Sequence, residues 1–200
     1  MKNASLTLVL FLVCALLAGC EPQNSVYPLV AASDDAFEPL MLGEWLLQSG
    51  PEVKAAERSG KAIFRKGKEP GTYEITMPDF DEKDMLLVSE AKLVKLGDFL
   101  FIDFGSPDLE GRTSATLPYP GLRSHVFGRV YSEKDKMRID FLSDTWVSDQ
   151  AKAGKLTLAS IETPEGRVLA AKTDELRKFA LEHAEDNEAF AESFAFQRKK

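Results

Sequence analysis

Three polar side chains in two neighbouring apolar runs have the types and spacing that could do chemistry. Asp103 lies in an apolar run over residues 99–104, and His125 and Arg129 flank Phe127 in a second run. Alternate residues of a β-strand share one face, so the three polar side chains could converge on one side of a sheet. An aspartate and a histidine in contact can serve as an acid and base pair, as in a hydrolase or an isomerase.

A structural role would account for the same residues. A carboxylate on an apolar face has to be paired or exposed at the strand end. Asp103 could accept hydrogen bonds from the turn amides of residues 105–106, and Arg129 could pair with Asp103 or stack on Trp45. We predict a structural contact between Asp103 and Arg129. We therefore assign no catalytic residue, and the ligand-binding candidates are Asp103, His125, Arg129 and Trp45.

Cysteine and histidine usage argues against several chemistries. Cys14 lies in an apolar N-terminal run and Cys20 follows it, so residues 21–200 contain no thiol for a nucleophile, a disulfide or a zinc site. His125 and His183 are far apart in sequence and have no partner at ligand spacing. No nucleophile elbow, dinucleotide fingerprint or phosphate-binding loop occurs. We expect no metal and no cofactor.

Short runs of β-branched, aromatic and alternating residues predict antiparallel strands between residues 40 and 142. Tight links such as Gly97-Asp98 favour an up-and-down meander. Helices are expected from Asp144 and Thr173, and a further short helix over residues 187–196. The predicted fold is mainly β, a curved or barrel-like sheet with C-terminal helices packed on it. The expected strands are 43–47, 61–66, 72–77, 85–96, 99–104, 124–131, 136–142, 156–161 and 167–171.

One long interruption divides the predicted strands. Residues 105–123 hold three prolines and three glycines. Loops longer than about 12 to 15 residues inside a compact domain are usually functional or disordered. We expect this segment to be a lid or a partner contact.

The N-terminal residues have the organisation of a secretory signal peptide. Lys2 precedes an apolar run over residues 6–17, which is too short to span about 30 Å of hydrocarbon as a helix. The Leu-Ala-Gly-Cys sequence at residues 17–20 resembles the lipobox of bacterial lipoproteins. That resemblance implies cleavage before Cys20, acylation of Cys20 and anchoring in a membrane. Because Glu21 and not aspartate follows, it also implies the outer membrane, with the protein facing the periplasm.

Three segments follow from this organisation. Residues 1–19 are the signal peptide, residues 20–37 are the acylated cysteine and a tether, and residues 38–200 are one β-rich domain. The composition, with 44 % hydrophobic and 28 % charged residues, is that of a globular domain with a core. The net charge of −7 disfavours a nucleic-acid partner, because neutralising phosphates needs clustered cations.

A wider resemblance concerns the folded part. Gly-Glu-Trp at residues 43–45 resembles the Gly-x-Trp motif of lipocalins and related calycin barrels, in which the tryptophan plugs the base of the barrel. Together with residues 93–103, 125–130 and 173–176, it is similar to a group of bacterial lipoproteins with a lipocalin-like sheet. The resemblance covers about residues 42–183 and implies a fold but no activity. The helix and strands expected after residue 142 depart from a lipocalin, so barrel closure does not follow from it.

These patterns lead to one expected function and one alternative. We expect a non-enzymatic, membrane-tethered periplasmic lipoprotein that binds a small apolar ligand or an envelope protein. An apolar cavity would favour the ligand, and a filled interior with an exposed apolar patch would favour the protein partner. The alternative is a hydrolase or isomerase that uses Asp103 and His125, and the separation of these side chains distinguishes the two.

Overall fold

The computed structural model describes residues 22–34, 36–48, 60–78, 86–106, 108–109, 124–164 and 166–199. The expected signal segment, Cys20 and most of the loop expected at residues 105–123 lie outside these ranges. None of the described helices has the length and the apolar character needed to span a membrane.

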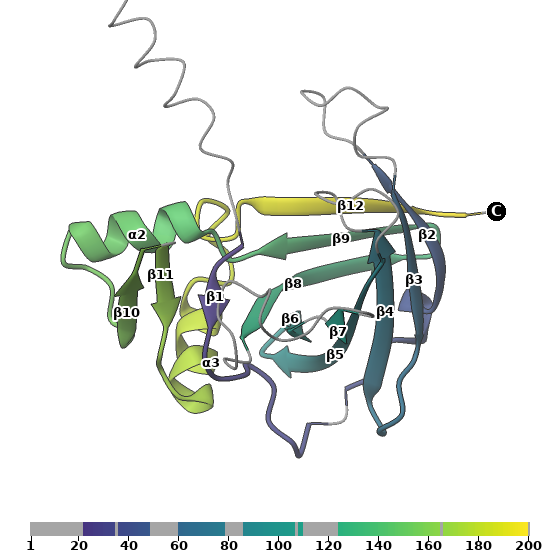
Figure 1. The fold of residues 1–200 in the computed structure, drawn as a ribbon, viewed down its shortest axis with the longest axis horizontal. Helices are drawn as coiled ribbons and strands as arrows, with labels where there is room; N and C mark the ends of the chain where they lie inside the picture. Colours follow the sequence, from purple (N-terminus) through teal and green to yellow (C-terminus); the bar gives the residue numbers. More distant parts are fainter. Residues whose placement is uncertain are drawn as a thin grey trace, which may run out of the picture.

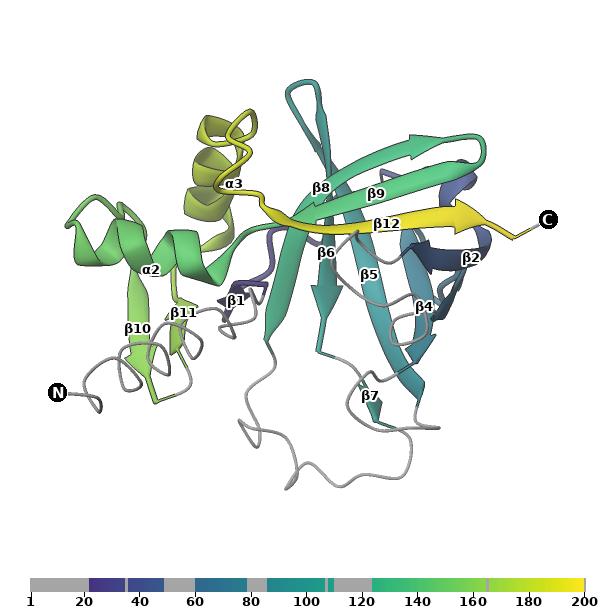
Figure 2. The same cartoon turned by 90° about the horizontal axis from the view of Figure 1, so that it is seen from above.

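Eight antiparallel strands close into a barrel (Figure 1 and Figure 2). Their order around the ring is β8, β6, β5, β4, β3, β2, β12 and β9, and the pairing of β9 with β8 completes it. The mainly β, barrel-like fold expected from the alternating runs is confirmed. The strands of the ring are β2 (Gly43–Gln48), β3 (Lys61–Lys66), β4 (Thr72–Pro78), β5 (Leu86–Leu96), β6 (Phe99–Gly105), β8 (His125–Glu133), β9 (Lys136–Phe141) and β12 (Glu192–Arg198).

The C-terminal segment is a strand, so the short helix expected over residues 187–196 was wrong. β12 lies between β2 and β9 and pairs antiparallel with both. Phe194 and Phe196 both pack into the barrel interior, which is the two-residue period of a strand. The helix prediction relied on the four-residue spacing of Phe190 and Phe194. The alternation that begins at Phe194 was the stronger signal.

One hydrophobic core fills the barrel. Aromatic rings from different strands meet inside it, with centroids 6.1 Å apart for Phe64 and Phe196 and 5.6 Å apart for Phe104 and Phe141. Interiors packed in this way leave little space between side chains. The side chains with almost no solvent contact include Trp45, Phe64, Tyr73, Ile75, Leu93, Ile102 and Met137.

A second core lies outside the barrel, against β6 and β8. Two helices and a hairpin gather on this side, as Figure 2 shows. They are α2 (Asp144–Lys152), α3 (Thr173–Glu182), β10 (Ser160–Thr163) and β11 (Gly166–Leu169), and the remaining short elements are β1 (Asn24–Ser25), η1 (Pro39–Met41) and β7 (Asp108–Leu109). β1 pairs antiparallel with β8 and parallel with β11, so it joins the hairpin to the barrel. Buried members of this core include Phe101, Phe127, Val147, Leu176 and Phe179.

The N-terminal residues 22–34 pack as part of this second layer, which differs from the tether expected over residues 20–37. Pro22 forms a bridge with Ser143, and the Gln23 amide donates to the Leu142 carbonyl at 2.8 Å. Leu29 is fully buried in the second core. The described part of the expected tether is therefore held along its length by the domain that follows it.

Candidate functional site

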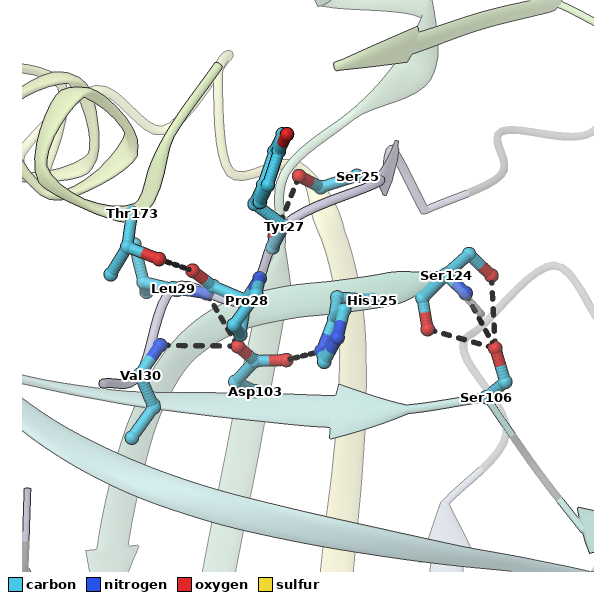
Figure 3. Close-up of polar contacts among 10 residues, drawn as sticks. All are labelled: Ser25, Tyr27, Pro28, Leu29, Val30, Asp103, Ser106, Ser124, His125 and Thr173. Carbon is cyan, nitrogen blue, oxygen red and sulfur yellow. Dashed lines mark hydrogen bonds and ion pairs between the residues drawn. The ribbon is translucent and has the colours of Figure 1, made fainter. Parts of the chain in front are cut away.

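Asp103 and His125 meet on the outer face of the barrel. In the β6–β8 register, Gly105 lies opposite His125 and Phe127 lies opposite Asp103. Asp103 and His125 are therefore diagonal neighbours on the outer face, which is within reach of a long side chain. His125 Nδ1 is 2.9 Å from Asp103 Oδ1 (Figure 3). The Asp103 side chain is 3 % exposed and the His125 side chain 24 % exposed, so the pair lies at the edge of the buried layer.

The second oxygen of Asp103 holds the N-terminal segment. Asp103 Oδ2 accepts hydrogen bonds from the amides of Leu29 at 2.5 Å and Val30 at 3.2 Å. The expectation that Asp103 takes the turn amides of residues 105–106 was wrong, because residues distant in sequence fill that role. Three hydrogen bonds satisfy a carboxylate that would otherwise be buried at a large free-energy cost. The sequence gives no signal for this contact, because residues 22–34 show no periodicity and resemble a tether.

Helix α3 holds the same N-terminal segment from the other side. The Thr173 hydroxyl donates to the Pro28 carbonyl at 2.8 Å, and Arg177 Nε donates to the Leu29 carbonyl at 3.0 Å. Arg177 also forms an ion pair with Asp34. Main-chain groups of residues 28–30 are therefore bound by side chains of β6 and α3, as Figure 3 shows for Asp103 and Thr173.

Ser106 and Ser124, the residues on either side of the segment 107–123, are hydrogen-bonded to each other. Ser106 Oγ accepts from the Ser124 amide at 2.6 Å and donates to the Ser124 carbonyl at 2.9 Å (Figure 3). Apart from Asp108 and Leu109, residues 107–123 lie outside the described part of the chain, so the expected lid or partner contact is not placed. Its two ends meet next to the Asp103 and His125 pair.

Arg129 lies away from Asp103, and the predicted contact between them was wrong. Arg129 is on the same outer face of β8 but is opposite Phe101, and its guanidinium donates to the Ala184 carbonyl at 2.5 Å and to Asn187 Oδ1 at 3.3 Å. It also lies 4.9 Å from the Phe190 ring centre. Arg129 therefore fixes the connection between α3 and β12 to the barrel.

Trp45 closes one end of the barrel, and Arg198 stacks on it, not Arg129. The Arg198 guanidinium carbon lies 4.2 Å from the Trp45 ring centre, and Trp45 Nε1 donates to the Met41 carbonyl at 2.8 Å. A Cβ at Gly43, where φ is +127°, would lie 2.8 Å from the Arg198 guanidinium. The Gly-x-Trp spacing thus leaves room for the arginine. Alternate residues of a strand share one face, so the alternation of Phe194 and Phe196, continued by two residues, places Arg198 on this inward face.

The other end of the barrel has an apolar rim. β2, β4 and β6 end there, while the short hairpin turns at residues 67–71, 97–98 and 134–135 lie at the Trp45 end. Phe104 and Phe141 are 8 % and 9 % exposed at this rim, whereas Ile102, one layer deeper, has no exposure. We call these inward-facing residues near the rim the mouth of the barrel: Leu47, Phe104, Val126, Phe141 and Phe194.

Comparison with protein-family models, with curated proteins and with solved structures finds no significant match to this chain. When His125 Nδ1 donates to Asp103, Nε2 carries the free lone pair, which is the orientation of a general base. No described hydroxyl forms a hydrogen bond with the imidazole. Among the described residues, no group of three or more His, Cys, Asp or Glu side chains could hold a metal ion.

Proposed function

We propose that this chain is a non-enzymatic lipoprotein of the outer membrane, held by an acylated Cys20 and facing the periplasm, whose barrel binds an apolar group at its mouth. The apolar run and the Leu-Ala-Gly-Cys sequence support the anchor. Only Glu21 separates Cys20 from Pro22, which already contacts Ser143. The domain then lies close to the membrane surface and not at the end of a long linker.

The contrast between the two ends of the barrel carries the binding proposal. Trp45 and Arg198 seal one end, and the deep interior is packed with side chains, so a ligand held inside the lumen is disfavoured. At the other end, the inward-facing residues remain apolar up to the rim. An apolar rim is the part of this barrel best suited to an acyl chain or to an apolar segment of an envelope protein.

Titration with a fluorescent fatty acid tests the binding proposal. The Cys20→Ser form of the protein should bind the probe, and Phe194→Ser at the mouth should weaken binding at least tenfold. Leu46→Ser is the matched control, because Leu46 is 42 % exposed on the outside of the adjacent strand. Equal binding by both variants would place the probe elsewhere. If no probe binds, a photo-crosslinker at residue 126 in cells should instead capture an envelope protein.

Fractionation of cells tests the anchor. Cys20→Ser should move the protein from the membrane to the soluble periplasmic fraction, because the acyl chains are lost. Glu21→Asp should move it from the outer to the inner membrane, as the resemblance to lipoproteins implies. A Cys20→Ser protein that stays on the membrane would contradict the anchor.

A second candidate function rests on the contact between Asp103 and His125. Their separation of 2.9 Å is the geometry that an acid and base pair requires, and the imidazole is partly exposed. A hydrolase or isomerase would then use His125 Nε2 as the base and Asp103 to orient the ring. Turnover of a small activated ester should be lost in His125→Gln and kept in His183→Gln. Equal rates for these two variants would exclude this function for that substrate class.

A further inference from the structure

The N-terminal residues 22–30, which we call the arm, lie in a groove between the barrel and the outer layer. β1 of the arm pairs with β8 on one side and with β11 on the other. Beyond β1, the Val26 amide donates to the Leu169 carbonyl at 2.8 Å. Figure 1 shows the arm between the hairpin β10–β11 and the barrel. The groove is therefore formed by residues far from the arm in sequence.

Most contacts of the groove are to the arm's main chain. Asp103 binds two consecutive amides, those of Leu29 and Val30, while Thr173 and Arg177 bind the preceding carbonyls. Contacts of this kind recognise an extended backbone largely without regard to its side chains. Side chains of the arm add selectivity, because Leu29 and Val30 are buried in the second core and the buried Gln23 side-chain amide donates to the Arg167 carbonyl at 2.5 Å.

A separate turn links the arm to the barrel. The Asp34 amide donates to the Ala31 carbonyl at 3.1 Å, and Ala32 and Ser33 between them are exposed. The turn makes no strand pairing of its own, but Asp34 forms an ion pair with Arg177 of α3, so opening the turn also breaks this contact. Exchange of an identical element between copies requires that the arm leaves its groove and that this hinge opens.

We propose that the groove is a peptide-binding site that the arm occupies as an intramolecular ligand, and that a second copy of this chain can supply the arm instead. The arm is the sequence seated in the groove, which makes a second copy the partner with matching chemistry. Released, residues 22–36 reach about 50 Å at roughly 3.3 Å per residue, enough to span to a neighbouring molecule. The proposal does not depend on the mouth of the barrel or on acylation.

Cleavage after folding separates a bound arm from an integral strand. A protease site inserted between Ala32 and Ser33 in the Cys20→Ser chain leaves the fold to form before the cut. The cleaved arm should remain bound through gel filtration, and a labelled peptide of residues 20–32 in excess should replace it. Asp103→Asn should speed loss of the arm at least tenfold, whereas Arg65→Met, on the exposed side of β3, should not. Unfolding of the barrel when the arm leaves, or failure of the peptide to enter, overturns the proposal.

The Cys20→Ser chain with the inserted protease site also tests whether a second copy can supply the arm. Incubation of the uncut chain at high concentration should yield a dimer in which arms are exchanged. Cutting the hinge should then convert the dimer into monomers that each keep a bound arm, because the hinge is the only link between them. A dimer that survives cleavage, or the absence of any dimer, would exclude the second copy as the source of the arm.

Discussion

Two regions of this molecule each use one charged side chain to hold several main-chain groups, and they do so with opposite charges. At the closed end, Arg198 donates to the carbonyls of Leu42 and Lys134, and to that of Leu40. On the outer face, Asp103 accepts from two amides of the arm. Arg198 is partly exposed at the closed end, where it covers Trp45, whereas Asp103 is buried.

This difference separates a seal from an attachment. The carbonyls at the closed end can be hydrated again if Arg198 is lost. The amides of Leu29 and Val30 are buried and have no other acceptor among the described residues. The buried carboxylate also contacts the His125 imidazole. The closed end is therefore expected to tolerate the loss of its charge better than the outer face.

The largest loss of stability should come from replacing Trp45. Trp45→Ala should lower the free energy of unfolding by about 3 to 5 kcal/mol, because it leaves a cavity at the closed end. Denaturant unfolding measures this. Leu46→Ala on the same strand should cost under about 1 kcal/mol, since Leu46 faces outward. Equal losses for both variants would mean that the seal contributes little.

The second largest loss of stability should come from replacing Asp103. Asp103→Ala leaves two buried amides without an acceptor and should cost about 3 kcal/mol. Double-mutant cycles then test the geometry. When Asp103→Ala is combined with Arg129→Met, the two losses of unfolding free energy should add within about 0.5 kcal/mol. When it is combined with His125→Gln, the two losses should show a coupling of about 1 kcal/mol. Coupling to Arg129 and none to His125 would contradict the contacts described.

Arg198→Met should have a smaller effect than Asp103→Ala. The methionine keeps part of the contact with Trp45 and loses the hydrogen bonds to carbonyls that water can reach, so we expect a cost of about 1 to 2 kcal/mol. Thermal unfolding of both variants under one condition gives the order. An Arg198 variant less stable than the Asp103 variant would reverse the distinction between seal and attachment.

The smallest loss of stability should come from replacing Tyr73. This residue is fully buried and stacks on Phe37, with the two ring centres 4.8 Å apart. Burial raises the pKa of Tyr73 to about 12. The folded state therefore keeps the phenol proton longer than the unfolded chain, so stability is retained below about pH 10 and falls between pH 10 and 12. Tyr73→Phe should cost about 1 kcal/mol at neutral pH and flatten this alkaline decline. An unchanged decline would assign it to other groups.

The sequence predicts the barrel strands well because alternation of apolar residues is a local signal. Phe64, Ile75 and Ile102 all occupy the inward positions of their strands. β12 was missed because the spacing of Phe190 and Phe194 fits a helix as well. A competing local period can therefore hide a strand whose two partners lie far away in the chain.

The candidate site is less predictable for a different reason. Alternation places Asp103, His125 and Arg129 on one face, which the structure bears out, but a face extends over several strands and does not specify contacts. The register makes both His125 and Arg129 diagonal neighbours of Asp103. His125 makes the contact, while Arg129 turns toward the Ala184 carbonyl and Asn187. The partners of Asp103 on the arm could not be inferred, because residues 22–34 show no periodicity.

The position of β12 in the ring has a consequence for the rate of folding. Arg198 pairs with Trp45, about 150 residues away along the chain, so closing the ring requires a contact of very large sequence separation. Until β12 docks, β2 and β9 each present an unpaired edge that another chain can extend. Barrel closure should therefore be a late, slow phase in refolding, and the yield of native protein should fall with concentration while that phase proceeds.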